Sequence, residues 1–356
     1  MDYHGLIQKF PLNRPLSDFE IRAQLRLNAP PRNKPWGMGS VIKMNSTYLE
    51  CVDKFYEDKG IISASGLVFV GMFIIFALLF TFDTIDAWAD RTPETRRENL
   101  YFLAFVLVVL LGGIIYFGSF LRHELFRHTH YPIRFNRKNR MVYVTRLDGT
   151  VMAESWDKLF FTEGQCGGRA IGFGEIRDVR GHRLAEDGNT VLDSFALPYY
   201  SDVKFNFRFC LWEFIRIYME NGPADLMRRV EKVNDVADRR EGFMTGWKLH
   251  HNFIFNHVGF LAYVVFPITL WYAAGRWIAM RTSKIPVWPS EVESACLIEP
   301  NDPYIIDRDH PPVELDEPDE PLVVDGEKEL DDLLKELDET LESLKKPDAR
   351  IDKLNE

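Results

Sequence analysis

The sequence of 356 residues is poor in cysteine, and its first residues show no pattern from which we would expect a secretion signal. Its four cysteines, Cys51, Cys166, Cys210 and Cys296, lie far apart and form no C-x-x-C pair, which argues against a zinc ribbon and a disulfide scaffold. We expect reduced thiols. The first residues do not show the charged stretch followed by a short apolar run that marks a signal peptide. Position 2 is Asp2, whereas N-myristoylation requires glycine there. We therefore expect the first apolar helix to act as its own targeting signal.

Catalytic motifs are also missing. The segment His123–His130 resembles a zinc-protease motif, but H-E-x-x-H requires histidine at position 127, where Arg127 stands. The remaining histidines that group together, His250, His251 and His257, fit polar residues beside a membrane better than metal ligands.

The glycine-rich segment Gly164–Gly174 contains neither of the phosphate-binding patterns G-x-x-x-x-G-K-[ST] and G-x-G-x-x-G before a helix. We expect a loop with a strand there. No histidine partner is identifiable for Cys166, and no G-x-S-x-G is present. Basic residues are not interleaved with aromatic ones as in a nucleic-acid surface. We therefore predict no catalytic residue, no cofactor-binding residue, no metal ligand, no nucleic-acid partner and no enzymatic activity.

The most prominent features of the sequence are two long apolar runs. Ile61–Phe82 and Leu100–Leu121 contain 22 residues each and no charged side chain. At about 1.5 Å rise per residue each can cross a hydrocarbon core of about 30 Å. The short polar segment Asp83–Asn99 between them predicts an antiparallel transmembrane hairpin, and Gly112, Gly113 and Gly118 permit close helix contact.

Lysine and arginine predict the orientation of this hairpin. The first 60 residues and the segment after Leu121 are rich in both, whereas the connecting segment contains only Arg91, Arg96 and Arg97. The positive-inside rule therefore places the N-terminus and the chain after Leu121 in the cytoplasm of a multi-pass membrane protein. Since neither helix contains an internal charge, we expect an anchor rather than an ion path.

A third apolar run, Phe253–Gly275, is long enough to span but contains Asn256, His257 and Pro267. It either crosses the membrane, which would place the C-terminal tail outside, or lies in the interface or against the hairpin. We expect membrane association and leave the crossing open.

Between the hairpin and this run the pattern becomes that of strands. Alternation and turn residues predict short strands over the following segments: Ile133–Phe135, Met141–Thr145, Val151–Trp156, Lys158–Thr162, Arg169–Ile176, Thr190–Ala196 and Val203–Phe209. An amphipathic helix is predicted over Cys210–Asn221, ended by Gly222-Pro223, and a second over Ala224–Arg239. The fold class is thus membrane α+β: a helical hairpin and a small antiparallel β-domain closed by an amphipathic helix.

The two ends of the chain differ in charge. The arm up to Ser40 is basic and rich in proline, which predicts an extended, poorly packed segment. From Glu291 onward there are 23 Asp and Glu against 7 Lys and Arg, so this region accounts for more than the whole net charge of −10. Such a composition predicts a largely disordered tail, with a short helix marked by leucines at 4-3-4-3 spacing from Leu330 to Leu344.

These features predict five regions. They are a basic cytoplasmic arm (1–60), the transmembrane hairpin (61–121), the cytoplasmic β-domain with its C-terminal helices (122–245), the third apolar segment (246–285) and the acidic tail (286–356).

Four segments, together with the hairpin, resemble an uncharacterised family of bacterial inner-membrane proteins. They are Tyr131–Tyr143, Trp156–Leu159, Trp212–Pro223 and Ile285–Pro289, and the resemblance covers roughly Asp53 to Tyr304. It implies a hairpin joined to a small β-domain of pleckstrin-homology-like build, often encoded near type VI secretion effectors. No functional residue carries over.

The resemblance favours an interaction protein in contact with the lipid bilayer and with a toxin or effector as protein partner, either as an immunity protein or as an effector accessory. The alternative is a membrane scaffold or sensor whose β-domain and basic arm bind anionic lipid.

Overall fold

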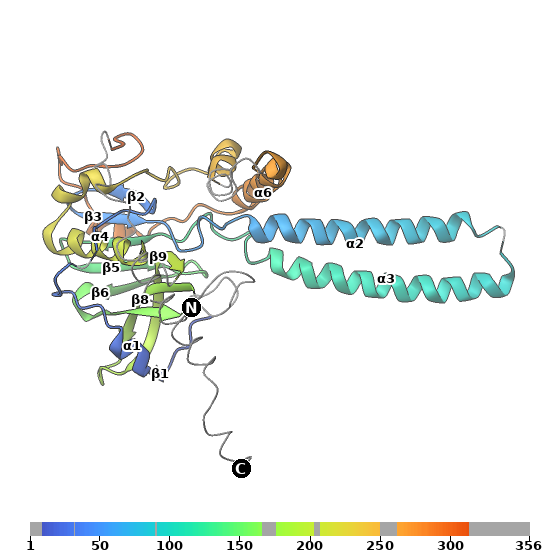
Figure 1. Ribbon diagram of the computed structural model, residues 1–356, viewed down its shortest axis with the longest axis horizontal. Helices are drawn as coiled ribbons and strands as arrows, with labels where there is room; N and C mark the ends of the chain where they lie inside the picture. The colour runs from blue at the N-terminus through green and yellow to red at the C-terminus, as the bar shows by residue number, and fades with distance from the viewer. Residues whose placement is uncertain are drawn as a thin grey trace, which may run out of the picture.

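The structure, a computed structural model, describes residues 9–31, 33–89, 91–165, 176–202, 207–249 and 262–312. Figure 1 shows a body of two sheets and several helices from which two long helices project side by side. The class is α+β with antiparallel sheets.

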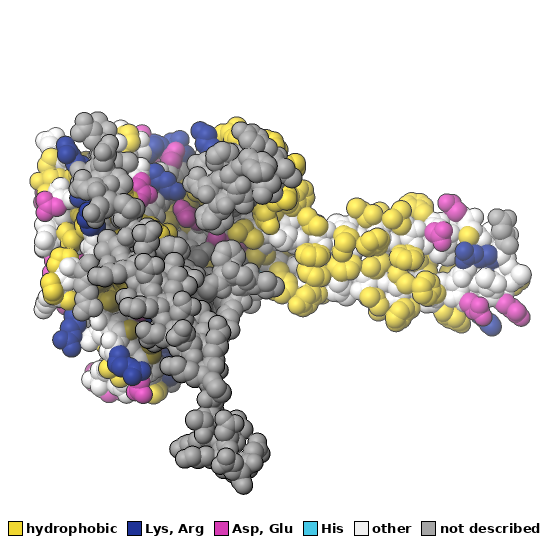
Figure 2. Space-filling view, viewed as in Figure 1, with side chains coloured by type: hydrophobic (Ala, Val, Ile, Leu, Met, Phe, Trp, Pro, Cys, Tyr) yellow, Lys and Arg dark blue, Asp and Glu magenta, His cyan; other side chains and the backbone are white. Residues whose placement is uncertain are grey.

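The projecting helices are α2 (Ile61–Asp86) and α3 (Pro93–Leu121). Both are long and apolar enough to cross a membrane, with hydropathies of 2.5 and 2.6 over their most apolar windows. Their outward side chains are largely apolar, as Figure 2 shows. This confirms the two predicted apolar helices.

The polar connection between them is shorter than predicted. Most of Asp83–Asn99 is helical, because α2 continues past its apolar run and α3 begins at Pro93, leaving only residues 87–92 between. Thr92 starts α3 as its N-cap: its hydroxyl accepts a hydrogen bond from the Thr95 amide, and proline suits the first helical position.

The larger sheet contains five strands in chain order: β2 (Val41–Met44), β3 (Tyr48–Cys51), β4 (Ile133–Asn136), β5 (Met141–Thr145) and β6 (Val151–Ser155). All neighbours are antiparallel, and Cys51 at the end of β3 lies opposite Ile133 at the start of β4. The hairpin is therefore an insertion between two paired strands. The expectation that residues 1–60 form an arm missed β2 and β3, which are strands of this sheet.

The smaller sheet has the order β1-β9-β8-β7. Its strands are β1 (Arg14–Pro15), β7 (Phe160–Gln165), β8 (Ile176–Leu184) and β9 (Thr190–Asp202). The N-terminal arm is packed here rather than loose: β1 pairs with β9, and the Leu25 amide donates to Phe161 O at 2.8 Å. A short helix between them, α1 (Asp18–Arg22), begins with a capping box formed by Ser17 and Glu20.

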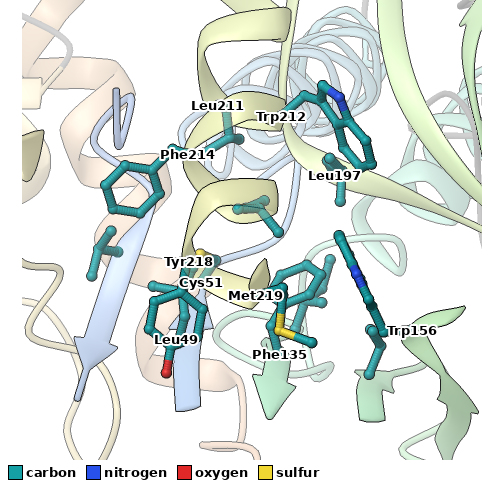
Figure 3. Packing of buried hydrophobic residues seen from close by; sticks show 14 of the residues in the cluster. Leu49, Cys51, Phe135, Trp156, Leu197, Leu211, Trp212, Phe214, Tyr218 and Met219 are labelled. Carbon is teal, nitrogen blue, oxygen red and sulfur yellow. The ribbon is translucent and has the colours of Figure 1, made fainter. Parts of the chain in front are cut away.

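Helix α4 (Phe207–Asn221) closes the core, as predicted, but begins three residues earlier. Its apolar side chains pack with those of both sheets; Figure 3 shows Trp212 of α4 near Trp156, and the two rings stack with centroids 5.8 Å apart. The predicted strand Val203–Phe209 is wrong for residues 207–209, which are helical, and residues 203–206 lie outside the described chain.

Five of the strands predicted after the hairpin are confirmed, four of them with shifted ends. β5 has its predicted bounds, β7 begins two residues after Lys158, and β9 extends six residues beyond Ala196. Of the predicted strand Arg169–Ile176 only the last residue is described, and it begins β8.

The second helix predicted over Ala224–Arg239 is wrong. Only the short 3-10 helix η2 (Ala224–Arg229) forms, and the chain then runs beside β2, where the Asn234 amide donates to Val41 O at 2.9 Å. Pairing with backbone distant in sequence has replaced helical hydrogen bonds there.

The C-terminal segments also pack on the body. Helix α6 (Ala262–Thr282) contains Pro267 and lies against the start of α2, while residues 253–261 of the third apolar run are outside the described chain. Residues 286–312 are not disordered: they include α7 (Ser290–Ala295), and Ile306 forms a β-bridge with Met44. The leucine-rich segment beyond residue 312 is outside the described chain.

Candidate functional site at the foot of the hairpin

A cavity of about 280 Å³ lies where the hairpin meets the body. We call it the junction cavity. Its walls come from five parts of the chain: residues 9–10, the turn at 53–59 before α2, the segment 123–133 after α3, the end of β5 with the turn after it at 144–148, and residues 195–196 of β9. Both feet of the hairpin contribute to its walls, so the cavity lies between the hairpin and the body.

The first turn of α2 is held by a residue that follows α3. Gly60, at the N-cap position, has no side chain to accept hydrogen bonds. The Glu124 carboxylate replaces it, accepting from the amides of Ile62 (3.3 Å) and Ser63 (2.8 Å) and from the Ser63 hydroxyl (2.6 Å). A carboxylate at a helix N-terminus also interacts favourably with the positive end of the helix dipole. The two feet of the hairpin are thus fastened to each other.

A buried ion pair fastens the same turn to α6. Arg276 is 1% exposed, and its Nε donates to Glu241 Oε2 at 2.8 Å. Its Nη1 donates to the carbonyl oxygens of Tyr56 (2.7 Å), Lys59 (3.1 Å) and Glu57 (3.2 Å), while the Tyr56 hydroxyl donates to Glu241. Burial alone would raise the pKa of Glu241, but the charge and hydrogen bonds of Arg276 hold it below its usual value.

Small residues allow α6 to approach α2 this closely. Gly60 has φ of +104°, and a Cβ there would lie 2.4 Å from the Arg276 Cα. A Cβ on Gly275 would lie 2.7 Å from that of Ala64. The Trp271 indole donates to Ala64 O at 3.0 Å. Both glycines are therefore required by backbone contact.

Two charged groups of opposite sign lie in the turn that lines the cavity. Lys59 is nine-tenths buried, and its Nζ donates to His128 O at 2.6 Å. Burial lowers the pKa of Lys59 to about 8, although the charge of Asp53 opposes this shift. Burial also raises the pKa of Asp53, whose oxygens accept from the amides of Phe55 (3.0 Å) and Tyr131 (2.8 Å). Shifted pairs of this kind are frequent at functional sites.

The histidines considered as ligands do not form a metal site in the described residues. His123 and His130 both line the cavity, whereas His128 lies in a β-bridge with Lys284. His130 is buried with its Nδ1 3.0 Å from the Thr129 hydroxyl, and burial lowers its pKa to about 3, so it is neutral. In the described residues no three His, Cys, Asp or Glu side chains group as a metal site would.

Other residues considered from the sequence fall elsewhere. His250, His251, His257 and Cys166 lie outside the described residues. Cys51, Cys210 and Cys296 are buried, and burial raises the pKa of Cys51 to about 12 and of Cys210 to about 11. Such thiols are weak nucleophiles.

Sequence reasoning missed Asp53, Lys59, Glu241 and Arg276. The available signal was a single arginine just after the third apolar run, since an arginine among apolar residues is expected to find a partner. Its partner is 35 residues away and its carbonyl acceptors more than 200, so no local pattern could identify them.

Comparison with known proteins gives one match. Residues 109–300 match DUF6708, a family of unknown function. No curated protein and no solved structure matches the chain. The matched region runs from the second half of α3 to just beyond α7 and includes Glu124, Glu241 and Arg276. It spans more than half of the sequence, so the chain belongs to the DUF6708 family of proteins of unknown function.

Proposed function

We propose that this protein is a non-enzymatic, membrane-anchored interaction protein, in which α2 and α3 cross the bacterial inner membrane and hold the β-body at its cytoplasmic face. The observation that carries this is the insertion of an outwardly apolar hairpin between β3 and β4. Apolar side chains exposed along two 26- and 29-residue helices would be costly in water. Because both ends of the hairpin continue into paired strands of one sheet, the body would be held at the membrane surface.

The orientation rests on charge. The body and its segments beside the hairpin are rich in Lys and Arg, so the positive-inside rule favours a cytoplasmic body with only the α2–α3 connection outside. The test is labelling of intact cells with a membrane-impermeant maleimide in a Cys166→Ser background. We expect Thr92→Cys to be labelled before lysis and Glu186→Cys, on the exposed turn between β8 and β9, only after lysis. Labelling in the reverse order would overturn this topology.

The partner that we propose is a type VI secretion toxin or effector, with immunity as the leading role and effector accessory as the other. Support comes from the resemblance described above, which also implies a pleckstrin-homology-like body. An immunity protein needs a binding surface in the right compartment and no catalysis. The test is coexpression with the toxin encoded beside it. Survival that is the same with and without this protein would exclude immunity.

A second candidate is a scaffold that binds anionic lipid. It is favoured by exposed basic side chains near the hairpin foot, Arg122, Arg281 and Lys284. The test uses the full chain, because cutting off the hairpin and everything before it would also remove β2 and β3 from the larger sheet. We expect phosphatidylglycerol in neutral micelles to raise Tm at low salt, and the Arg122→Gln/Arg281→Gln variant to lose most of this shift. An equal shift in the variant would exclude this surface.

A further inference from the structure

We propose that the junction cavity binds a single-chain anionic amphiphile, with the anionic head group at Lys59 and the chain against the apolar wall. The head-group chemistry is a carboxylate or a phosphate, and the body of the ligand is an unbranched hydrocarbon chain.

The apolar wall supplies the first argument. Six apolar side chains from the five parts of the chain that form the cavity line its wall: Phe10, Phe55, Ile133, Val144, Leu147 and Phe195. A volume of about 280 Å³ is at the small end of ligand sites, which are typically about 300–1,000 Å³. A single chain is therefore favoured over a two-chain lipid.

The charge of Lys59 supplies the second argument. An ammonium group has three donors, and the described residues offer its Nζ one acceptor, His128 O. A cation that is nine-tenths buried is costly unless an anion accompanies it. Two further cations, Lys9 and Arg127, stand at the edge of the same cavity and are exposed.

The acidic groups of the wall are already engaged as acceptors. Asp53 accepts from two backbone amides, and Glu124 holds the first turn of α2. Asp148 accepts from the amide and hydroxyl of Thr150 in its own turn. The other buried lysine of the wall, Lys54, is paired with Asp178. Within the described part of the chain no carboxylate is in direct contact with the Lys59 ammonium, which favours an anionic rather than a cationic ligand.

The experiment measures displacement of a fluorescent probe, 11-(dansylamino)undecanoic acid, from the full chain in a neutral maltoside detergent. We expect decanoate and decyl phosphate to displace the probe and decyltrimethylammonium to have little effect at the same concentration. Equal displacement by the cationic amphiphile, or no saturable probe binding, would overturn the proposal. Since no bilayer is present, the outcome does not depend on the topology proposed above.

Variants locate the site. Lys59→Met removes the charge and keeps the length of the side chain, and we expect probe affinity to fall at least about tenfold, the effect of losing a charged hydrogen bond. Lys158→Met, an exposed lysine far along the chain in the turn before β7, is the matched control and should bind as wild type. Unchanged binding by Lys59→Met would count against the proposal.

A second variant covers the case in which Lys59→Met does not fold. Ala196 lines the cavity and is partly exposed, so Ala196→Phe should fill the space and weaken binding of the probe without changing any charge. Undiminished binding would place the ligand elsewhere and overturn the proposal. Native mass spectrometry of protein extracted from membranes distinguishes the two possible head groups, since a fatty acid and a phosphate-headed lipid differ in mass.

Discussion

Arg276 shows how a single side chain can join three parts of the chain. Its guanidinium contacts Glu241 and three carbonyl oxygens of the turn before α2. We expect Arg276→Met to lower stability by about 3–5 kcal/mol, because Glu241 would remain buried without its partner. The measurement is thermal unfolding of the full chain in detergent.

Arg281→Met is the matched control, since Arg281 lies on the same helix and is exposed. The double variant Arg276→Met/Glu241→Gln should recover part of the loss, because the unpaired carboxylate is then gone. A Tm for Arg276→Met equal to that of Arg281→Met would contradict the buried pairing.

Lys59 predicts a dependence of stability on pH. Its folded pKa of about 8 lies below the unfolded value of 10.5, so between these values the unfolded chain binds more protons and stability rises with pH. Lys59→Met lacks this group. We expect wild type to gain up to about 2 kcal/mol relative to Lys59→Met between pH 7 and pH 9.5.

Parallel Tm series for the two proteins measure this difference, which cancels groups that titrate in both. A difference in Tm that stays constant over the range would mean that Lys59 is not held at a lowered pKa.

At the scale of elements, not all of the glycines in α3 lie at its contact with α2. Of Gly112, Gly113 and Gly118, only Gly113 faces α2 closely, since a Cβ there would lie 2.8 Å from the Phe73 ring. Gly112 and Gly118 have nothing within 4 Å of an added Cβ. The predicted close helix contact is therefore confined to one of these positions.

Gly113→Leu is expected to separate the helices and to cost about 1–3 kcal/mol by overpacking. Gly112→Leu makes the same chemical change one position away and should be tolerated. Thermal unfolding and protease resistance in detergent compare the two. Similar losses for both variants would show that α2 and α3 pack through another face.

Elements with a repeating local pattern were predictable from sequence. β5 has the bounds that its alternation predicts, and α4 has a strong apolar face at helical spacing. The segment 230–239 is not helical, because the Asn234 backbone amide donates to Val41 O of β2 and its side-chain amide to Gly39 O in the turn before β2. Leu226 and Val230 of this predicted helix are buried and Val233 packs against the core, but tertiary pairing decided the conformation.

At the scale of the whole molecule, the C-terminal segment packs on the paired strands β3 and β4 of the larger sheet. Trp288 donates from its indole to Glu50 Oε1 at 3.0 Å, and the Arg134 guanidinium lies 4.4 Å from the Tyr48 ring and 4.7 Å from that of Trp288. Residues 286–312 thus complete the body, although their acidic, proline-rich composition predicted disorder.

We expect Trp288→Ala to destabilise the body by about 3–5 kcal/mol, the usual cost of truncating a buried tryptophan. Its neighbour Val287 is 88% exposed, so Val287→Ala is a matched control with little expected effect. Thermal unfolding followed by circular dichroism compares them. A small loss for Trp288→Ala would show that this segment is dispensable for the sheet.

The sequence by itself determined the two apolar helices, the antiparallel strands after them and the amphipathic helix, because hydrophobicity and its period are properties of neighbouring residues. Only the tertiary structure decided that β2 and β3 belong to the same sheet as β4, so that the hairpin is an insertion between paired strands. It also decided that Tyr56, Glu241 and Arg276 meet at the hairpin foot. Pairing across more than 80 residues in the sheet, and more than 200 in this cluster, depends on long-range packing that leaves no local pattern.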